Sequence, residues 1–103
     1  MLKNYESMIV ISPELSIDDS KKENEKITSF ITENKGSIEN TDEWGKKKLA
    51  YEIKKFKEGY YFVNYFQFDP EMISELERIY RINENIIRYN ILVKEKKGGK
   101  NGS

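Results

Sequence analysis

The run from Tyr60 to Phe68, Tyr-Tyr-Phe-Val-Asn-Tyr-Phe-Gln-Phe, restricts the possible folds more than any other part of this sequence. Aromatic and β-branched side chains dominate it, and such side chains favour the pleated surface of a β-sheet. Successive side chains of a strand point to opposite faces, so the run presents two different aromatic faces. One face carries Tyr60, Phe62, Asn64, Phe66 and Phe68, and the other carries Tyr61, Val63, Tyr65 and Gln67. The run therefore requires a sheet around it, and only one of its faces can meet helices.

Three further segments have the pattern of strands: residues 5–11, 38–53 and 86–93. The first ends before Pro13, which has no N–H to donate to a sheet. Gly45 interrupts the second and indicates a β-bulge or a close approach of the backbone. Residues 54–59 connect the second strand to the aromatic run. They predict a hairpin in which Gly59 takes a positive φ.

The first helix is expected within residues 16–34, although its two halves differ. Residues 18–26 contain no apolar side chain, whereas the second half has an apolar stripe with helical spacing. Ser20 and Glu23 have the spacing of a capping box, which predicts that the stable part of the helix begins at Ser20. Gly36 is the predicted stop at its C-terminal end.

The second helix begins at Asp69-Pro70, because aspartate caps a helix and proline suits its first position. It ends at Asn83 or Asn85. The order β-α-β-β-α-β, with right-handed crossovers, predicts an α+β fold, the ferredoxin-like βαββαβ sandwich. In this fold, two helices cover one face of a four-stranded antiparallel sheet whose first and third strands are central. Residues 1–94 form this single domain, and the Gly/Lys-rich residues 95–103 are expected to be a disordered basic tail.

The chemistry of the side chains disfavours several classes of function. The 103 residues include no histidine and no cysteine, which removes the commonest general base and the thiolate nucleophile and metal ligand. There is no Gly-rich phosphate loop and no isolated carboxylate pair in an apolar setting. We therefore predict no enzyme, no catalytic residue, no metal site, no cofactor and no small-molecule substrate. No apolar run approaches the roughly 20 residues of a membrane span, and the first residues enter a strand directly, so a soluble cytoplasmic protein without a targeting peptide is expected.

One face of the predicted sheet is left uncovered. The phenylalanine-rich side of residues 60–68 is assigned to the core, because phenylalanine is buried more often than tyrosine. The uncovered face then carries a cluster of apolar and aromatic residues from the two central strands: Met8, Val10, Tyr61, Val63 and Tyr65. Clustered apolar residues on a surface often mark a binding site. This face is therefore predicted to bind a partner.

A second interpretation of the aromatic run stays open. Residues 58–65 resemble the aromatic motif of the RNA-recognition module and lie on the matching strand of the matching topology. The match fails at Glu58, where the motif has a base, and at Tyr61, where it has a small residue. This alternative, a free-standing module for single-stranded RNA, would place Tyr60 and Phe62 on the exposed face.

The net charge is zero, so the distribution of the charges matters more than their sum. Lysines cluster at residues 46–48 and 54–57. Three consecutive lysines on a strand cannot all face one way, and lysines on an edge strand also protect against aggregation. A basic rim close to aromatic residues nevertheless suits contact with a nucleic-acid backbone. From composition alone, a protein-binding module is an equally good interpretation.

Four stretches together resemble the family of the sixth protein of the bacterial small ribosomal subunit. They are Tyr5-Glu6, Glu43-Trp44-Gly45-Lys46-Lys47-Lys48-Leu49-Ala50-Tyr51-Glu52-Ile53-Lys54-Lys55, Gly59-Tyr60-Tyr61, and Arg81-Ile82-Asn83-Glu84-Asn85-Ile86-Ile87-Arg88. The resemblance covers residues 3–94. The sequence departs from the family pattern at Glu52, where the family usually has proline. It also has lysine where the family often has arginine, and lysine offers a point charge rather than a bidentate fork.

The resemblance implies a structural protein of the cytoplasmic ribosome. Such proteins bind small-subunit ribosomal RNA in the platform region together with a small basic partner, the eighteenth protein of the same subunit. The uncovered face would contact that partner, and the protein would be a monomer off the ribosome. The residues that the resemblance and the basic clusters place toward RNA are Lys46, Lys47, Lys48, Lys54, Lys55, Arg81 and Arg88.

Overall fold

The computed structural model describes residues 1–94, and the predicted tail at residues 95–103 lies outside them. The four strands are β1 (Lys3–Ile11), β2 (Ser37–Ile53), β3 (Phe56–Phe68) and β4 (Ile86–Lys94). The helices are α1 (Ile17–Glu33), the short 3-10 helix η1 (Pro70–Met72) and α2 (Ile73–Ile82). As predicted, Asp69 caps the start of η1, where its carboxylate accepts a hydrogen bond from the backbone N–H of Glu71 at 2.9 Å, and α2 ends at Asn83.

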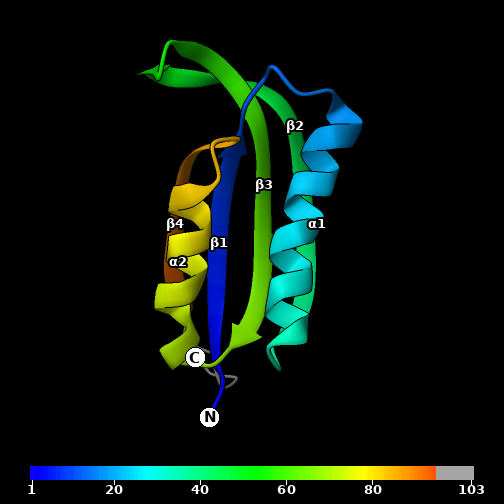
Figure 1. Ribbon diagram of the computed structural model, residues 1–103, viewed down its shortest axis with the longest axis vertical. Coiled ribbons are helices and arrows are strands. Elements are labelled where there is room, and N and C mark those ends of the chain that lie inside the picture. Colours follow the sequence, from blue (N-terminus) through cyan, green and yellow to red (C-terminus); the bar gives the residue numbers. More distant parts are fainter. Residues whose placement is uncertain (95–103) are drawn as a thin grey trace, which may run out of the picture.

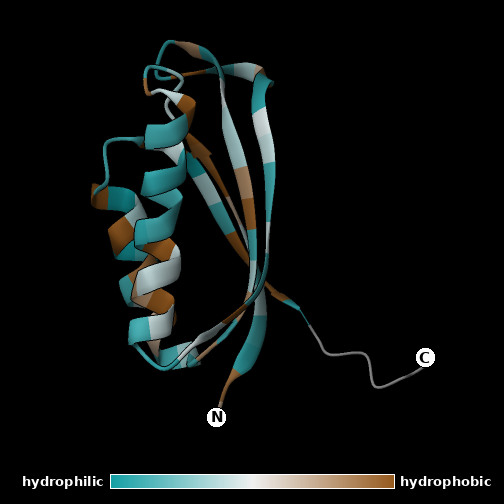
Figure 2. Cartoon of the chain, turned by 90° about the vertical axis from the view of Figure 1, so that its right-hand side faces the viewer, coloured by the Kyte–Doolittle hydropathy of each residue, from teal (hydrophilic) through white to brown (hydrophobic). Residues whose placement is uncertain are grey.

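The strands form one antiparallel sheet in the order β2-β3-β1-β4. Both α1 and α2 lie on one face of this sheet, and within residues 1–94 no helix covers the other face (Figures 1 and 2). The predicted ferredoxin-like sandwich is therefore confirmed, with β1 and β3 in the centre. The β1–α1, β2–β3 and α2–β4 connections meet at one end of the molecule, the upper end in Figure 1.

The phenylalanine-rich face of β3 packs beneath the helices, as the sequence predicts. Phe62, Phe66 and Phe68 are buried and form the centre of the core with residues of β1, α1 and α2. The ring of Tyr5 stacks on Phe66 with centroids 5.6 Å apart. Because burying one large apolar side chain contributes roughly 1.5–3 kcal/mol, this face supplies a large share of the favourable free energy of folding.

Helix α1 occupies the predicted residues 16–34, but its regular part begins at Ile17, before the predicted Ser20. Ser16 caps it, and its hydroxyl oxygen accepts a hydrogen bond from the backbone N–H of Asp19 at 3.0 Å. Ser20 is buried inside the first turns, where its hydroxyl donates to the carbonyl of Ile17 at 2.6 Å. The predicted capping box of Ser20 with Glu23 is therefore wrong. The prediction assumed that the inner side of a helix must be apolar, whereas the first half of α1 packs through polar side chains.

The polar inner side of α1 is held by a pair of buried amides. The Asn64 side-chain N–H donates to Oδ1 of Asn24 at 2.8 Å, and the Asn24 side-chain N–H donates to Oδ1 of Asn64 at 3.2 Å. The Thr41 hydroxyl donates to the same oxygen of Asn64 at 2.8 Å. These bonds join α1, β2 and β3, and they replace the apolar contacts that residues 18–26 cannot make.

Glu23 links α1 to the end of α2. One of its carboxylate oxygens accepts a hydrogen bond from the Asn83 side chain at 2.9 Å, and the other lies 2.9 Å from Nζ of Lys26. Burial acts to raise the pKa of Glu23, but the hydrogen bonds from Asn83 and Lys26 outweigh it and leave this pKa below its ordinary value. A carboxylate with a lowered pKa stabilises the folded state above the ordinary pKa and loses that contribution as pH falls through the lowered value.

The substitution Glu23→Gln is therefore expected to reduce the free energy of unfolding by about 1 kcal/mol at pH 7, because the amide keeps the shape and loses the charge. Urea unfolding of both proteins between pH 7 and pH 2.5 measures the difference. The difference should be constant above about pH 4.5 and shrink below it. Glu25→Gln, at an exposed position of the same helix, is the control and should cost less than about 0.5 kcal/mol at pH 7. A Glu23→Gln difference that grows as pH falls would contradict the lowered pKa.

The connection from α1 to β2 uses Lys35 and Gly36 in different ways. Lys35, not the glycine, takes the left-handed conformation with φ 72°. Gly36 donates its N–H to the carbonyl of Ile31 at 2.8 Å, which ends the helix as predicted. A Cβ on Gly36 would lie 2.6 Å from Cγ2 of Ile31 and 2.8 Å from the carbonyl oxygen of Gln67. The glycine is thus required by the close approach of α1 to β3.

The hairpin between β2 and β3 is tighter than predicted. Its two turn residues are Lys54 and Lys55, with φ 51° and 73°, so the loop is a two-residue turn of the I′ type. Gly59 is a strand residue without positive φ, which corrects the prediction for it. A Cβ on Gly59 would lie 2.5 Å from Val10, so close packing requires this glycine. The bulge predicted at Gly45 is confirmed by its φ of 78° and a shift of strand register.

Candidate RNA-facing and partner-facing surfaces

The β2–β3 hairpin projects past the rest of the sheet. Strand β1 pairs with β3 only as far as Ile11 opposite Tyr60, whereas β2 pairs with β3 up to Ile53 opposite Phe56. The outer part of the hairpin therefore has no third strand beside it, and it bends across the upper end toward β4 (Figure 1). Residues 45–58 contain six lysines and two glutamates. The hairpin thus carries a concentrated positive charge away from the core.

The three consecutive lysines of β2 point to both faces of the sheet, as predicted. Strand register places Lys46 opposite Tyr60 and Lys48 opposite Glu58. Tyr60 faces the helices, so Lys46 and Lys48 point to the helix side and Lys47 points to the open face. The ammonium group of Lys46 lies 5.2 Å from the centre of the Tyr60 ring, within reach of a cation–π interaction.

The predicted basic residues share one end of the molecule. Lys54 and Lys55 form the hairpin turn, Arg81 lies in the last turn of α2, and Arg88 lies near the start of β4, all at the upper end (Figure 1). Within residues 1–94, none of the seven predicted RNA-binding residues has a carboxylate oxygen within 4.0 Å. The cations that do form ion pairs there are Lys21, Lys22, Lys26, Arg78 and Lys94. The cations of the upper end are thus free to meet an external anion.

Arg88 is oriented by an aromatic residue rather than by an acid. Its guanidinium group donates to the hydroxyl of Tyr51 at 3.0 Å and lies 5.5 Å from the centre of that ring. This contact joins the bent hairpin to β4. It keeps the charge of Arg88 available, because a tyrosine hydroxyl does not neutralise a cation.

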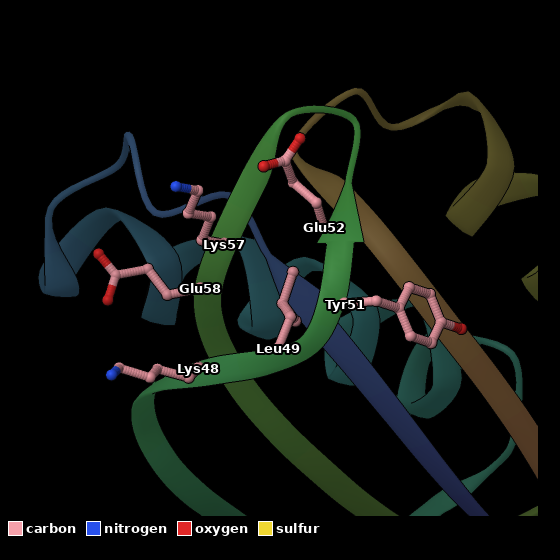
Figure 3. Close-up of a pocket in the computed structure, with 6 residues that line it drawn as sticks. All are labelled: Lys48, Leu49, Tyr51, Glu52, Lys57 and Glu58. Carbon is pink, nitrogen blue, oxygen red and sulfur yellow. The ribbon is translucent and has the colours of Figure 1, made fainter.

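A shallow hollow lies inside the bend of the hairpin. It is lined by Lys48, Leu49, Tyr51, Glu52, Lys57 and Glu58 (Figure 3). Tyr51 points toward β4, away from Lys48, Lys57 and Glu58.

In the part of the chain that the structure describes, no three side chains of the His, Cys, Asp or Glu types gather as metal ligands would. Nor does any helix there have the length and apolar character needed to cross a membrane. The hollow of the hairpin is lined by two lysines and two glutamates, so charges of both signs are available there for contact with another molecule.

The turn residues themselves allow a test of the basic hairpin. A type I′ turn favours Asn-Gly, since both positions have positive φ. The double substitution Lys54→Asn, Lys55→Gly is therefore expected to stabilise the protein by about 1 kcal/mol. If both lysines contact phosphates, it should also weaken RNA binding at 0.15 M salt by roughly 10- to 30-fold. Thermal unfolding and RNA titration measure the two effects. If the variant is more stable but binds RNA with the same affinity, neither Lys54 nor Lys55 contacts the RNA.

The open face differs from the prediction in its exposure. Strand register places all five predicted residues on it, Met8, Val10, Tyr61, Val63 and Tyr65. Val10 and Val63 are only 0% and 1% exposed, however, whereas the other three are half-buried. Neighbouring side chains already cover the two valines. They form the floor of this face, and Met8, Tyr61 and Tyr65 form its accessible part.

Two exposed aromatic residues on this side did not enter the predicted site. Trp44 is 48% exposed and Tyr51 is 61% exposed. The Trp44 ring stacks on Tyr61, with centroids 6.0 Å apart and planes 12° apart. The bulge at Gly45, which the sequence does indicate, could have drawn attention to its neighbour Trp44.

The placement required by the RNA-recognition module is wrong. That interpretation puts Tyr60 and Phe62 on the open face as stacking platforms. Both side chains instead point under the helices, with exposed fractions of 7% and 3%. The matching topology is therefore not accompanied by the surface residues that the module uses.

Comparisons with known proteins agree with this fold. The family model described as "Ribosomal protein S6" matches residues 4–93. A "Small ribosomal subunit protein bS6" from Caldanaerobacter subterraneus subsp. tengcongensis is 45% identical over 88% of this chain and 96% of that protein. One from Helicobacter pylori is 44% identical over 93% of this chain and 68% of that protein. The crystal structure of 30S ribosomal protein S6 from Thermotoga maritima has 38% identity and a TM-score of 0.86, covering 91% of this chain and 89% of that one. The chain belongs to the ribosomal protein S6 family of the small ribosomal subunit.

Proposed function

We propose that this protein is a structural component of the ribosome in the cytoplasm that binds small-subunit ribosomal RNA in the platform region. It does so together with a small basic partner, the eighteenth protein of the same subunit, and it is a monomer before assembly. Its role is to bridge RNA and protein rather than to catalyse a reaction. Family membership supports the ribosomal role, and the charges of the upper end support the contact with RNA.

The observation that carries the RNA contact is the set of seven cations at the upper end that have no carboxylate partner within residues 1–94. In a chain with no net charge, so many like charges gathered at one end repel one another unless an anion neutralises them. A phosphate backbone supplies such an anion, and release of its counterions supplies much of the free energy of binding.

The accessible part of the open face suits a basic protein partner. Tyr65 lies between acidic groups, because Glu6 pairs with it across β1 and Asp42 lies next to its row on β2. Loss of solvent around the ring, and then the carboxylates of Glu6 and Asp42, raise the pKa of Tyr65. Glu6 is paired with Lys94 at 3.4 Å, whereas Asp42 has no cation within 4.0 Å in residues 1–94, so Asp42 is the free acid near Tyr65, and the hairpin end of the face is basic. A cationic partner can occupy the first region while RNA occupies the second.

The proposal is tested by titrating a labelled platform-region fragment of small-subunit ribosomal RNA with the full chain, with and without the eighteenth protein. We expect tight, salt-dependent binding only when both proteins are present. Equal binding of this chain alone to unstructured single-stranded RNA would contradict the bridging role. Failure of the two proteins together to bind the fragment more tightly than the eighteenth protein alone would contradict the RNA contact.

The partner face has its own test. The substitution Tyr65→Ser is expected to weaken binding of the eighteenth protein about 10-fold or more, because large aromatic anchors dominate protein interfaces. The free energy of unfolding should fall by less than about 1.5 kcal/mol, since the side chain is half-buried. Val93→Ser, at an edge position that is 60% exposed, is the control. Isothermal titration calorimetry measures the partner affinity. If Tyr65→Ser and Val93→Ser bind the eighteenth protein with equal affinity, Tyr65 does not lie in the interface.

A further inference from the structure

An aromatic strip crosses the open face at the level of the Gly45 bulge. Strand register aligns one residue from each strand in a row: Gly45 of β2, Tyr61 of β3, Val10 of β1 and Arg88 of β4. Trp44 stacks on Tyr61 at the β2 end of this row, and Tyr51 contacts Arg88 at the β4 end. Val10, in the same row, is fully buried. The strip therefore has two exposed rings, Trp44 at its β2 end and Tyr51 at its β4 end.

The two rings are exposed although each is already held in place. Trp44 rests against Tyr61 in a nearly parallel stack, so its orientation is set and about half of its surface stays open. Tyr51 is fixed by the guanidinium group of Arg88 at its hydroxyl and its ring. Large aromatic rings that are oriented but uncovered are costly to leave in water and are suited to receive a flat ligand.

The charges around the strip indicate the class of ligand. Two cations lie at the strip on the open face: Arg88 in the row itself, and Lys47 at the next outward-facing position of β2 toward the hairpin tip. The acids of this face lie on the other side of the row, away from the hairpin tip: Asp42 is next to the strip, opposite Val63, and Glu6 is one outward-facing position farther, opposite Tyr65. A ligand that offers both a π face and a negative charge matches this order, and a nucleotide offers both. A basic protein segment fits the acidic region below and is repelled by the cations at the strip.

We propose that Trp44 and Tyr51 stack on unpaired bases of the bound RNA, while Lys47 and Arg88 neutralise the phosphates beside those bases. This inference rests on the proposed function and adds base stacking to the phosphate contacts. It differs from the RNA-recognition module, because the platform consists of Trp44 at a β-bulge and Tyr51 on the bent hairpin. It also divides the open face, with the nucleic acid at the strip and the protein partner at Tyr65 and Met8.

Trp44 is the only tryptophan in the 103 residues, so it can be observed alone. The full chain is labelled with 5-fluorotryptophan, and its single 19F resonance is followed while the unlabelled eighteenth protein and then the platform RNA fragment are added. RNA binding is followed separately by the anisotropy of a dye on the RNA. We expect the resonance to shift when RNA is added to the two proteins and to change little with the protein partner alone.

Affinity measurements give the second readout. Trp44→Ala and Tyr51→Ala are each expected to weaken RNA binding by roughly 5- to 150-fold, the range for one base stacked on one ring. Trp44→Phe should recover most of the loss, because it restores a ring. The slope of log affinity against log salt should be the same for Trp44→Ala, Trp44→Phe and the unchanged protein, since the side chain at position 44 does not contact a phosphate. Thermal unfolding of each variant separates these effects from damage to the fold.

Each outcome decides the proposal. A shift with RNA, together with a loss of affinity at constant salt slope, supports stacking. If the RNA binds but the resonance does not move, or if the partner protein alone produces the full shift, stacking on Trp44 is overturned while the proposed function stands. If anisotropy shows no RNA binding beyond that of the partner, both the stacking and the proposed function fail.

Discussion

Replacing Asn64 with leucine is expected to lower the free energy of unfolding by about 2–4 kcal/mol, although the two side chains are similar in size. Asn64 is fully buried and makes three hydrogen bonds, two with Asn24 and one with Thr41. Leucine would leave both polar groups of Asn24 buried without a partner, and each such group costs about 1–3 kcal/mol. The Thr41 hydroxyl is only half-buried and can turn to water. Urea unfolding with a linear extrapolation measures the loss.

The double variant Asn24→Leu, Asn64→Leu separates the two causes of that loss. When both partners become apolar, no polar group remains unpaired, so the double variant is expected to be more stable than Asn64→Leu alone. Asn40→Leu, at an exposed position of β2, is the control and should change stability by less than about 0.5 kcal/mol. If Asn64→Leu costs less than 1 kcal/mol, the amide pair does not hold the first half of α1 against the sheet.

This amide pair also marks where sequence reasoning reaches its limit. The four strands, the packing of Phe62, Phe66 and Phe68, and the cap at Asp69 follow from local patterns that need no partner elsewhere in the chain. The packing of the first half of α1 does not follow from a local pattern. Its polar side chain Asn24 is buried because it forms hydrogen bonds with Asn64, a residue 40 positions away in the sequence. A periodicity of apolar residues carries no signal for such a contact.

The surface was predictable to a smaller extent. Alternation along β3 assigns Tyr61 and Tyr65 to the open face, and register confirms that placement. Val10 and Val63 are buried although they point to the open face, and alternation along a strand does not describe how neighbouring side chains cover a residue. The positive φ of Lys54 and Lys55 was missed for a similar reason. Lysine is uncommon in that conformation, so the glycine at position 59 drew the prediction instead.

The triple substitution Lys46→Ala, Lys47→Ala, Lys48→Ala is expected to weaken assembly with ribosomal RNA about 100-fold at 0.15 M salt. Each phosphate that a lysine neutralises contributes roughly 0.7–0.9 to the slope of log affinity against log salt. Loss of three contacts should therefore lower the steepness of that slope by about 2–3. All three side chains are exposed, so the free energy of unfolding should change little apart from the Lys46 contact with Tyr60.

The control for this variant removes the same charge from the opposite end. Lys3, Lys35 and Lys94 lie at the start of β1, after α1 and at the end of β4, which is the lower end in Figure 1. Their replacement by alanine should leave the salt slope nearly unchanged, because a contact with phosphate acts locally whereas net charge acts on the whole molecule.

The opposite orientations of these lysines allow a finer test. Lys46 and Lys48 point to the helix side and Lys47 to the open face, so Lys46→Ala, Lys48→Ala and the single change Lys47→Ala report on different faces of the hairpin. If RNA surrounds the projecting hairpin, the pair should lower the slope by about 2 and the single change by about 1. If only Lys47 matters, the RNA lies on the open face alone, beside Trp44. If the triple variant has an unchanged slope of log affinity against log salt, these lysines do not contact phosphates. Their role is then to block pairing of the exposed edge strand β2 with other chains.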